Sequence, residues 1–205
     1  KVVTGIRMCG KQYAKKNNQV FHLLFSHFHW DHVQGLPFFD PAYKSDTVFH
    51  IYSNYPDMRR FLEAQMEVPY FPVRMNTFTK NIFWHDIKDA VPFKIGGMQI
   101  ITKLMFHPGD SHSYLLMENG KRFIHATDVE LRQVDFERTE ENIAFFENTD
   151  VLVLDAQYTV EETAQKIAAS SDFKAIADNK DNPSGDVQYG RETVERLFSV
   201  TAYIR

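Results

Sequence analysis

Three histidines and one carboxylate lie together in residues 27–32, whose sequence is HFHWDH. Imidazole nitrogen and carboxylate oxygen are the ligands that borderline divalent metal ions prefer. In a loop that leaves a strand, alternate residues can point the same way, so we expect His27 and His29 to bind one ion. Asp31 and His32, one step further on, would turn toward a second. The alternative, a surface cluster with no role, leaves unexplained why these residues directly follow an apolar run.

Hydrophobic periodicity and turn residues predict the elements that must position this cluster. The apolar run Val20–Ser26 predicts a buried strand that ends at the cluster. The other expected strands are Thr47–Tyr52, Met98–Phe106, Ser113–Met117, Arg122–Ala126 and Asp150–Asp155, with a hairpin turn at Asn119-Gly120. The expected helices are Asp57–Met66, Thr139–Asn148, Val160–Ala169 and Arg191–Phe198. Residues 69–81 read as a loop that could form a lid or a substrate wall. This order predicts mixed sheets covered by helices.

The HFHWDH cluster closely resembles the HxHxDH signature of the metallo-β-lactamase superfamily. The resemblance continues downstream in the same order. His107, in Phe106-His107-Pro108-Gly109, matches the superfamily's third-motif histidine, and Asp128 matches the carboxylate that bridges both metals. Residues 151–158 (VLVLDAQY) and 3–7 (VTGIR) resemble segments of its ribonuclease Z-like branch. The resemblance covers residues 3 to about 160.

The resemblance implies an α+β fold, the metallo-β-lactamase αβ/βα four-layer sandwich, in which two mixed β-sheets are flanked by helices. Residues 1–205 would form a single domain, with N-terminal strands and internal pieces of the fold absent from this sequence. It also implies a binuclear site, in which a hydroxide between the ions is the nucleophile and Asp31 orients it. The expected ligands are His27, His29 and His107 for metal 1, and Asp31, His32 and the bridging Asp128 for metal 2. Zinc is the expected metal, with manganese or iron as alternatives.

Strand ends offer a second, independent argument for the same residues. His27, His107, Asp128 and Asp155 each lie at the C-terminal end of an expected strand, where rigid backbone can hold ligands while loops shape a pocket. Asp155 is expected to hold the other ring nitrogen of a ligand histidine. His112 is a candidate substrate contact, with a surface or hairpin role as the alternative.

For the other histidines and for Trp30, the sequence predicts a role less specifically. Trp30 is expected to pack beneath the loop, with a place in the substrate wall as the alternative. His125 is expected to pack or to support a ligand, and His22, His50 and His85 to be structural. The superfamily pattern includes one more histidine ligand after the fourth motif, whereas the last histidine here is His125. Either the sequence joins segments across gaps, or the chain is a divergent relative with a weakened second metal site.

The net charge of the chain helps to choose between classes of substrate. The net charge of −4 disfavours a protein that coats the phosphates of a long nucleic acid. We therefore expect hydrolysis of a small phosphodiester, such as a cyclic nucleotide. The alternatives are a thioester or lactone hydrolase on the same centre, or a metal-binding sensor or partner module with weakened catalysis.

The single cysteine, Cys9, excludes an internal disulfide and fits the cytoplasm. No apolar run is long enough to span a bilayer, so no membrane partner is expected. Homodimerisation is left open, because many relatives dimerise.

Overall fold

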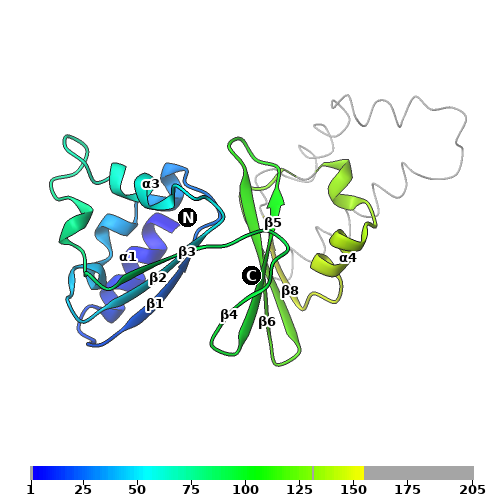
Figure 1. The fold of residues 1–205 in the computed structure, drawn as a ribbon, viewed down its shortest axis with the longest axis horizontal. Helices are drawn as coiled ribbons and strands as arrows, with labels where there is room; N and C mark the ends of the chain where they lie inside the picture. Colours follow the sequence, from blue (N-terminus) through cyan, green and yellow to red (C-terminus); the bar gives the residue numbers. More distant parts are fainter. Residues whose placement is uncertain (1, 131, 155–205) are drawn as a thin grey trace, which may run out of the picture.

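The computed structural model describes residues 2–130 and 132–154. Two β-sheets lie side by side, and helices cover their outer faces (Figure 1). The helices α1 (Val2–Tyr13) and α3 (Met58–Ala64) cover the sheet drawn in blue to teal, and α4 (Glu140–Phe146) lies beyond the green sheet. The resulting order of helix, sheet, sheet and helix confirms the predicted four-layer α+β sandwich.

The first sheet contains three parallel strands in the order β1-β2-β3. These strands are β1 (Val20–Leu24), β2 (Val48–Ser53) and β3 (Ile82–Asp86). β1 and β2 confirm the strands predicted from the sequence, whereas β3 was not predicted. The prediction that β1 is buried was wrong: Val20 is 56% exposed, because β1 lies at an edge of the sheet among the described residues.

The second sheet contains five strands in chain order, antiparallel except for the final parallel pair. They are β4 (Phe93–Ile95), β5 (Met98–Met105), β6 (Ser111–Glu118), β7 (Lys121–Ala126) and β8 (Val151–Leu154). The predicted hairpin joins β6 to β7 through Asn119 and Gly120, whose φ angles of 52° and 73° suit a tight two-residue turn. Among the described residues, strand directions mix only in this sheet.

Each sheet buries one apolar face against the helices outside it. Side chains alternate along a strand, so Phe49 and Ile51 of β2 point into the core beneath α1 and α3 while His50 and Tyr52 lie on the other face. On the second sheet, Leu115 and Ile124 pack with Phe145 of α4. These two cores hold the sheets rigid, which leaves the loops at the strand ends to carry chemistry.

Short helices connect the strands near the HFHWDH cluster. They are α2 (Trp30–Val33), η1 (Leu36–Phe38) and η2 (Asp40–Tyr43); η3 (Met75–Thr77) and η4 (Gln133–Phe136) occur later in the chain. η3 falls within residues 69–81, which were predicted to be a loop. The Thr139 side chain accepts a hydrogen bond from the backbone N–H of Asn142 and so begins α4, as predicted.

Several sequence predictions fall elsewhere or remain outside the description. Residues 3–7, which resemble a segment of the ribonuclease Z-like branch, lie inside α1. The predicted helices Val160–Ala169 and Arg191–Phe198, and Asp155, lie outside the described residues.

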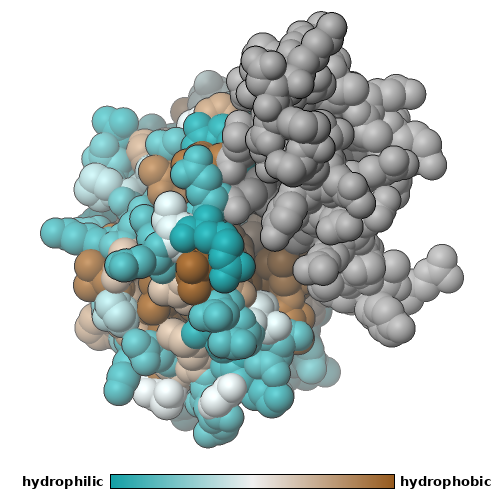
Figure 2. Space-filling model, turned by 90° about the vertical axis from the view of Figure 1, so that its right-hand side faces the viewer, coloured by the Kyte–Doolittle hydropathy of each residue, from teal (hydrophilic) through white to brown (hydrophobic). Residues whose placement is uncertain are grey.

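In the described ranges, every helix is too short or too polar to cross a membrane. The face in Figure 2 is largely polar (teal) where it is described, with smaller apolar areas (brown) between.

Candidate metal centre

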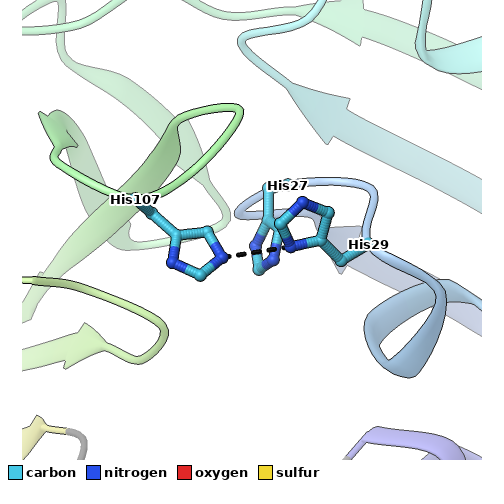
Figure 3. A group of neighbouring side chains, drawn as sticks. All are labelled: His27, His29 and His107. Atoms are coloured by element: carbon cyan, nitrogen blue, oxygen red, sulfur yellow. Dashed lines mark hydrogen bonds between the residues drawn. The ribbon is translucent and has the colours of Figure 1, made fainter.

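The predicted ligands come from the segments that follow three strands and from the short helix α2. His27 and His29 follow β1, and the first turn of α2 supplies Asp31 and His32. His107 follows β5 in the second sheet, and Asp128 follows β7. Figure 3 shows the side chains of His27 and His29 meeting that of His107 across the space between two loops. The sandwich thus brings together residues that lie far apart in the sequence.

The first group consists of His27, His29 and His107. Each residue offers a nitrogen atom, and the three atoms lie within 4.8 Å of one another. Nε2 of His107 lies 3.0 Å from Nδ1 of His29 (Figure 3). The ring of His27 crosses the other two steeply, at 87° to His29 and 68° to His107. Crossed rings allow in-plane lone pairs to converge on one point, as a metal ion requires.

The second group consists of His27, His32 and Asp128. Their potential ligand atoms also lie within 4.8 Å of one another. Nε2 of His32 lies 2.5 Å from Oδ2 of Asp128, and the His27 and His32 ring centroids are 4.3 Å apart. His27 therefore belongs to both groups and forms the junction between two candidate ion positions.

Asp31 lies beside the second group rather than within it. Its Oδ2 is 3.4 Å from Nε2 of His32, and its side chain is 56% exposed. The predicted assignment of Asp31 to metal 2 stays a prediction. The exposed position leaves this carboxylate open to solvent and to a bound substrate.

His27 has the environment of a metal ligand. The residue is 2% exposed, and its Nδ1 lies 3.1 Å from Oγ of Ser26 and 3.5 Å from Oγ of Ser111. Its Nε2 is buried without a hydrogen-bond partner among the described residues. Burial, followed by the charges of His32, His29 and His107, lowers the His27 pKa to about 4, although Asp128 opposes the shift. The ring is therefore neutral near pH 7. With the proton on Nδ1, the Nε2 lone pair is available to a metal.

This buried nitrogen tests whether the residues fit a metal. An unpaired buried polar atom costs roughly 1–3 kcal/mol, and proteins rarely retain one without a function. Here the atom lies among nitrogen and oxygen atoms that could share one ion with it. Metal-bound histidines also typically have their second ring nitrogen held by a polar partner, as the two serines hold Nδ1. The donor set fits divalent metal ions, with the Nε2 of His27 as a ligand to one of them.

Tyr55 connects the two loops that carry the first group. Its hydroxyl donates toward the carbonyl oxygens of Gly109 and Asp110, both at 2.9 Å, just after His107. Its ring meets Phe28, between His27 and His29, edge to face at 5.5 Å. Burial and the charges of Asp110 and Asp89 raise the Tyr55 pKa to about 12, so the hydroxyl keeps its proton and remains a donor. Sequence reasoning missed Tyr55, because it lies more than fifty residues from its partners.

His112 is buried between the sheets rather than open to a substrate. It is 7% exposed, with Nε2 3.2 Å from Oδ2 of Asp89 and Nδ1 3.3 Å from the carbonyl oxygen of Ser26. Burial opposes ionisation of Asp89, but the hydrogen bond and charge of His112, with smaller contributions from Thr102 and Lys103, outweigh it and lower the Asp89 pKa. His112 therefore ties the start of β6 to the carbonyl before His27. Asp155 lies outside the described residues.

A pocket of about 190 Å³ adjoins the candidate centre. Its walls include His27 and His32 of the candidate centre. The remaining lining residues come from α1, from β1 and the two residues after it, from η1 and from the second sheet: Ile6, His22, Leu23, Leu24, Phe25, Ser26, Leu36, Tyr114 and His125. The histidines are therefore reached from a partly apolar space.

Comparison with known families identifies the class of protein. Residues 7–179 match the family model described as the beta-lactamase superfamily domain, which is more than half of the chain. The chain therefore belongs to the metallo-β-lactamase superfamily, as the motifs had indicated. No curated protein matches it.

Two solved structures, from different organisms, are among those similar to this chain. The chain is 17% identical to the metallo-beta-lactamase fold protein YhfI from Bacillus subtilis, covering 71% of this chain and 52% of that one, with a TM-score of 0.47. It is 15% identical to the short form of human tRNase Z, covering 70% of this chain and 60% of that one, with a TM-score of 0.49. The chain thus spans between half and two thirds of these proteins.

Proposed function

We propose that this protein is a binuclear metal-dependent hydrolase that cleaves a small phosphodiester, such as a cyclic nucleotide. The superfamily and the cluster of histidines and aspartate support a metal-dependent hydrolase in general. The observation that carries the proposal is the buried, unpartnered Nε2 of His27, a residue that belongs to both groups of potential ligands. Because the two groups adjoin at His27, ions held by them would be neighbours, with the His27 Nε2 lone pair binding one of the two.

The residues divide between two ion positions. His27, His29 and His107 would hold one ion, and His32 and Asp128, with Asp31 beside them, would hold the second. Divalent ions held there would act as Lewis acids on the phosphate and lower the pKa of water toward neutrality. Zinc is proposed because the donors are imidazole and carboxylate, with manganese or iron as alternatives.

The chain's own residues would orient the reaction. The exposed Asp31 carboxylate would accept a hydrogen bond from the attacking water and so fix its direction. Tyr55 would keep the His107 loop in place, and Ser26 and Ser111 would keep the His27 ring in one orientation. Fixed groups of this kind do not have to reorganise during the reaction, which lowers its barrier.

Charge and motifs support the choice of substrate. The net charge of −4 disfavours a long RNA, whose binding depends on many basic contacts. The VLVLDAQY segment and the residues that follow His107 resemble the phosphodiesterase side of the superfamily. A small phosphodiester satisfies both observations.

The test combines metal content with substrate choice on the full-length protein, purified without chelator. We expect close to two ions per chain by elemental analysis, and hydrolysis of bis(p-nitrophenyl) phosphate in preference to thioesters or lactones. The His27→Ala variant should lose both the metal and the activity. Its matched control is His50→Ala, which removes a histidine outside the candidate centre. Hydrolysis of thioesters or lactones alone would overturn the phosphodiester proposal, and one ion or none would overturn the binuclear one.

A further inference from the structure

Large apolar side chains are exposed directly beside the candidate metal centre. Trp30, between His29 and Asp31 in the chain, is 67% exposed, so the prediction that it packs beneath the loop was wrong. Its ring meets that of Tyr70 edge to face, with centroids 6.5 Å apart and an interplanar angle of 76°. Tyr70 is 72% exposed, and Val68 beside it is 69% exposed. We call Trp30, Val68 and Tyr70 the apolar platform.

The fold holds the platform without burying it. The backbone N–H groups of Tyr70 and Phe71 both donate to the carbonyl oxygen of Glu67, at 2.8 and 3.1 Å, which makes a tight turn. Phe71 anchors this turn, because it packs against the first core and meets the Phe38 ring at 5.5 Å. The neighbouring Tyr70 side chain is left outside. The core therefore does not need the exposed rings, and their exposure calls for another explanation.

Ligand binding is the explanation that the position favours. Contiguous exposed apolar residues mark binding surfaces. Tyr and Trp rings stack on nucleobases, and this stacking tolerates any base because every base has a π-face. A standard protein interface buries about 800 Å² of surface on each partner. Three side chains alone cover less than this area, so a small ligand fits the platform better than a second copy of the chain.

We propose that Trp30 and Tyr70 bind the aromatic ring of the substrate, so that the phosphodiester cleaved at the neighbouring centre carries a nucleobase. This inference rests on the proposed function, because it assumes a phosphate held at the candidate metal centre. The metal centre would hold the phosphate, and the platform would select for the base. A substrate with only a sugar or an alkyl group would use the first contact and lose the second.

The test compares two ligands that differ only in the base. Adenosine 5′-monophosphate and ribose 5-phosphate have the same charge and the same sugar phosphate. Binding to the metal-loaded full-length protein is followed by tryptophan fluorescence in a Trp84→Phe background, where Trp30 alone reports; Trp84 packs against the first core. We expect the adenosine ligand to bind about tenfold more tightly and to quench Trp30, because base stacking contributes at about this level.

Variants of Tyr70 show whether the platform causes the preference. Tyr70→Ala should reduce the affinity ratio of the two ligands toward one, whereas Tyr70→Phe should preserve it because the ring remains. The matched control is Val91→Ala, which truncates an exposed apolar residue outside the platform and should leave the ratio unchanged. With a nucleoside phosphodiester as substrate, Tyr70→Ala should raise KM more than it lowers kcat.

The outcomes separate this inference from the proposed function. Equal affinities in the unsubstituted protein, or a base preference that survives Tyr70→Ala, would overturn the inference even if bis(p-nitrophenyl) phosphate is hydrolysed. If adenosine 5′-monophosphate quenches Trp30 and ribose 5-phosphate does not, but no phosphodiester is hydrolysed, the platform would be supported and the proposed function overturned. A dimer that Tyr70→Ala converts to a monomer would assign the surface to a second copy of the chain and overturn the inference.

Discussion

The chain contains two groups of histidines, and they differ in what their nitrogen atoms meet. In the candidate metal centre, the ring of His27 crosses those of His29 and His107 at 87° and 68°, and one nitrogen atom of each residue converges on a common region (Figure 3). In the first sheet, His22, His50 and His85 form what we call the imidazole row. There the rings are nearly parallel, at 12° between His22 and His50 and 23° between His50 and His85.

Nitrogen atoms of the imidazole row have partners within the row or on the adjacent Tyr52. Nδ1 of His50 lies 2.9 Å from Nε2 of His85, and Nδ1 of His22 lies 3.1 Å from the hydroxyl of Tyr52. Among the described residues, both groups of three potential metal ligands lie in the candidate centre, and the row contributes to neither. Histidine content alone therefore does not make a metal site.

Position relative to the strands explains the difference. The imidazole row lies within β1, β2 and β3, where side chains of neighbouring strands stand side by side, perpendicular to the sheet. That arrangement favours parallel rings and pairwise contacts. The candidate centre lies just after strands, in loops whose backbone can turn each ring separately. Loops at strand ends, held by rigid sheets, are therefore the places where several nitrogen atoms can meet at one point.

The largest expected effect separates the two groups directly. His107→Ala should lower metal content by about one ion per chain and reduce hydrolysis of bis(p-nitrophenyl) phosphate more than 100-fold, beyond the 10- to 100-fold typical of residues that only support a ligand. His85→Ala, in the imidazole row, should retain both ions. Elemental analysis and steady-state rates provide the measurements. If His85→Ala lost an ion while His107→Ala kept both, the assignment of the two groups would be reversed.

A smaller effect is expected from Tyr55, which joins the two ligand loops. Tyr55→Phe removes the hydroxyl that holds the carbonyl oxygens after His107 but keeps the ring that contacts Phe28, so the first ion should bind about tenfold more weakly. Competition with a coloured chelator measures this affinity.

The matched control for Tyr55→Phe is Tyr43→Phe. The Tyr43 hydroxyl also donates to a backbone carbonyl, that of Pro37 at 2.6 Å, but it lies away from the ligand loops. Both variants lose a hydroxyl of the same kind, and only Tyr55→Phe should change metal affinity. Equal affinities in the two variants would show that Tyr55 supports the fold rather than the ligands.

The smallest effect concerns pH and the imidazole row. Burial, then the charges of His50 and His85, lowers the His22 pKa, and burial with the charge of His50 lowers the His85 pKa. The folded chain therefore binds fewer protons than the unfolded chain as pH falls through the ordinary histidine range near 6.5, so stability is lost in that direction. Urea denaturation of chelator-treated protein at pH 7.5 and 5.5 measures this loss. The free energy of unfolding should fall less between the two pH values for His85→Gln than for the unsubstituted chain. If both chains lost the same free energy of unfolding between pH 7.5 and 5.5, the imidazole row would not contribute to the loss of stability in acid.

The sequence by itself determined the local parts of this protein. The HFHWDH spacing indicated a metal cluster because its residues are neighbours in the chain. Periodicity and turn residues predicted β1, β2, the β6–β7 hairpin, α3 and α4, because the order of apolar, polar and turn residues that marks each of them lies within a short segment.

Tertiary structure decided which distant residues meet and which are buried. It brought His107 to His29, 78 positions away, placed His27 in both ligand groups, and connected the ligand loops through Tyr55. It also left Trp30 exposed and put β1 at a sheet edge. The physical reason is that periodicity shows which face of an element is apolar, whereas burial and site geometry depend on what packs against that face.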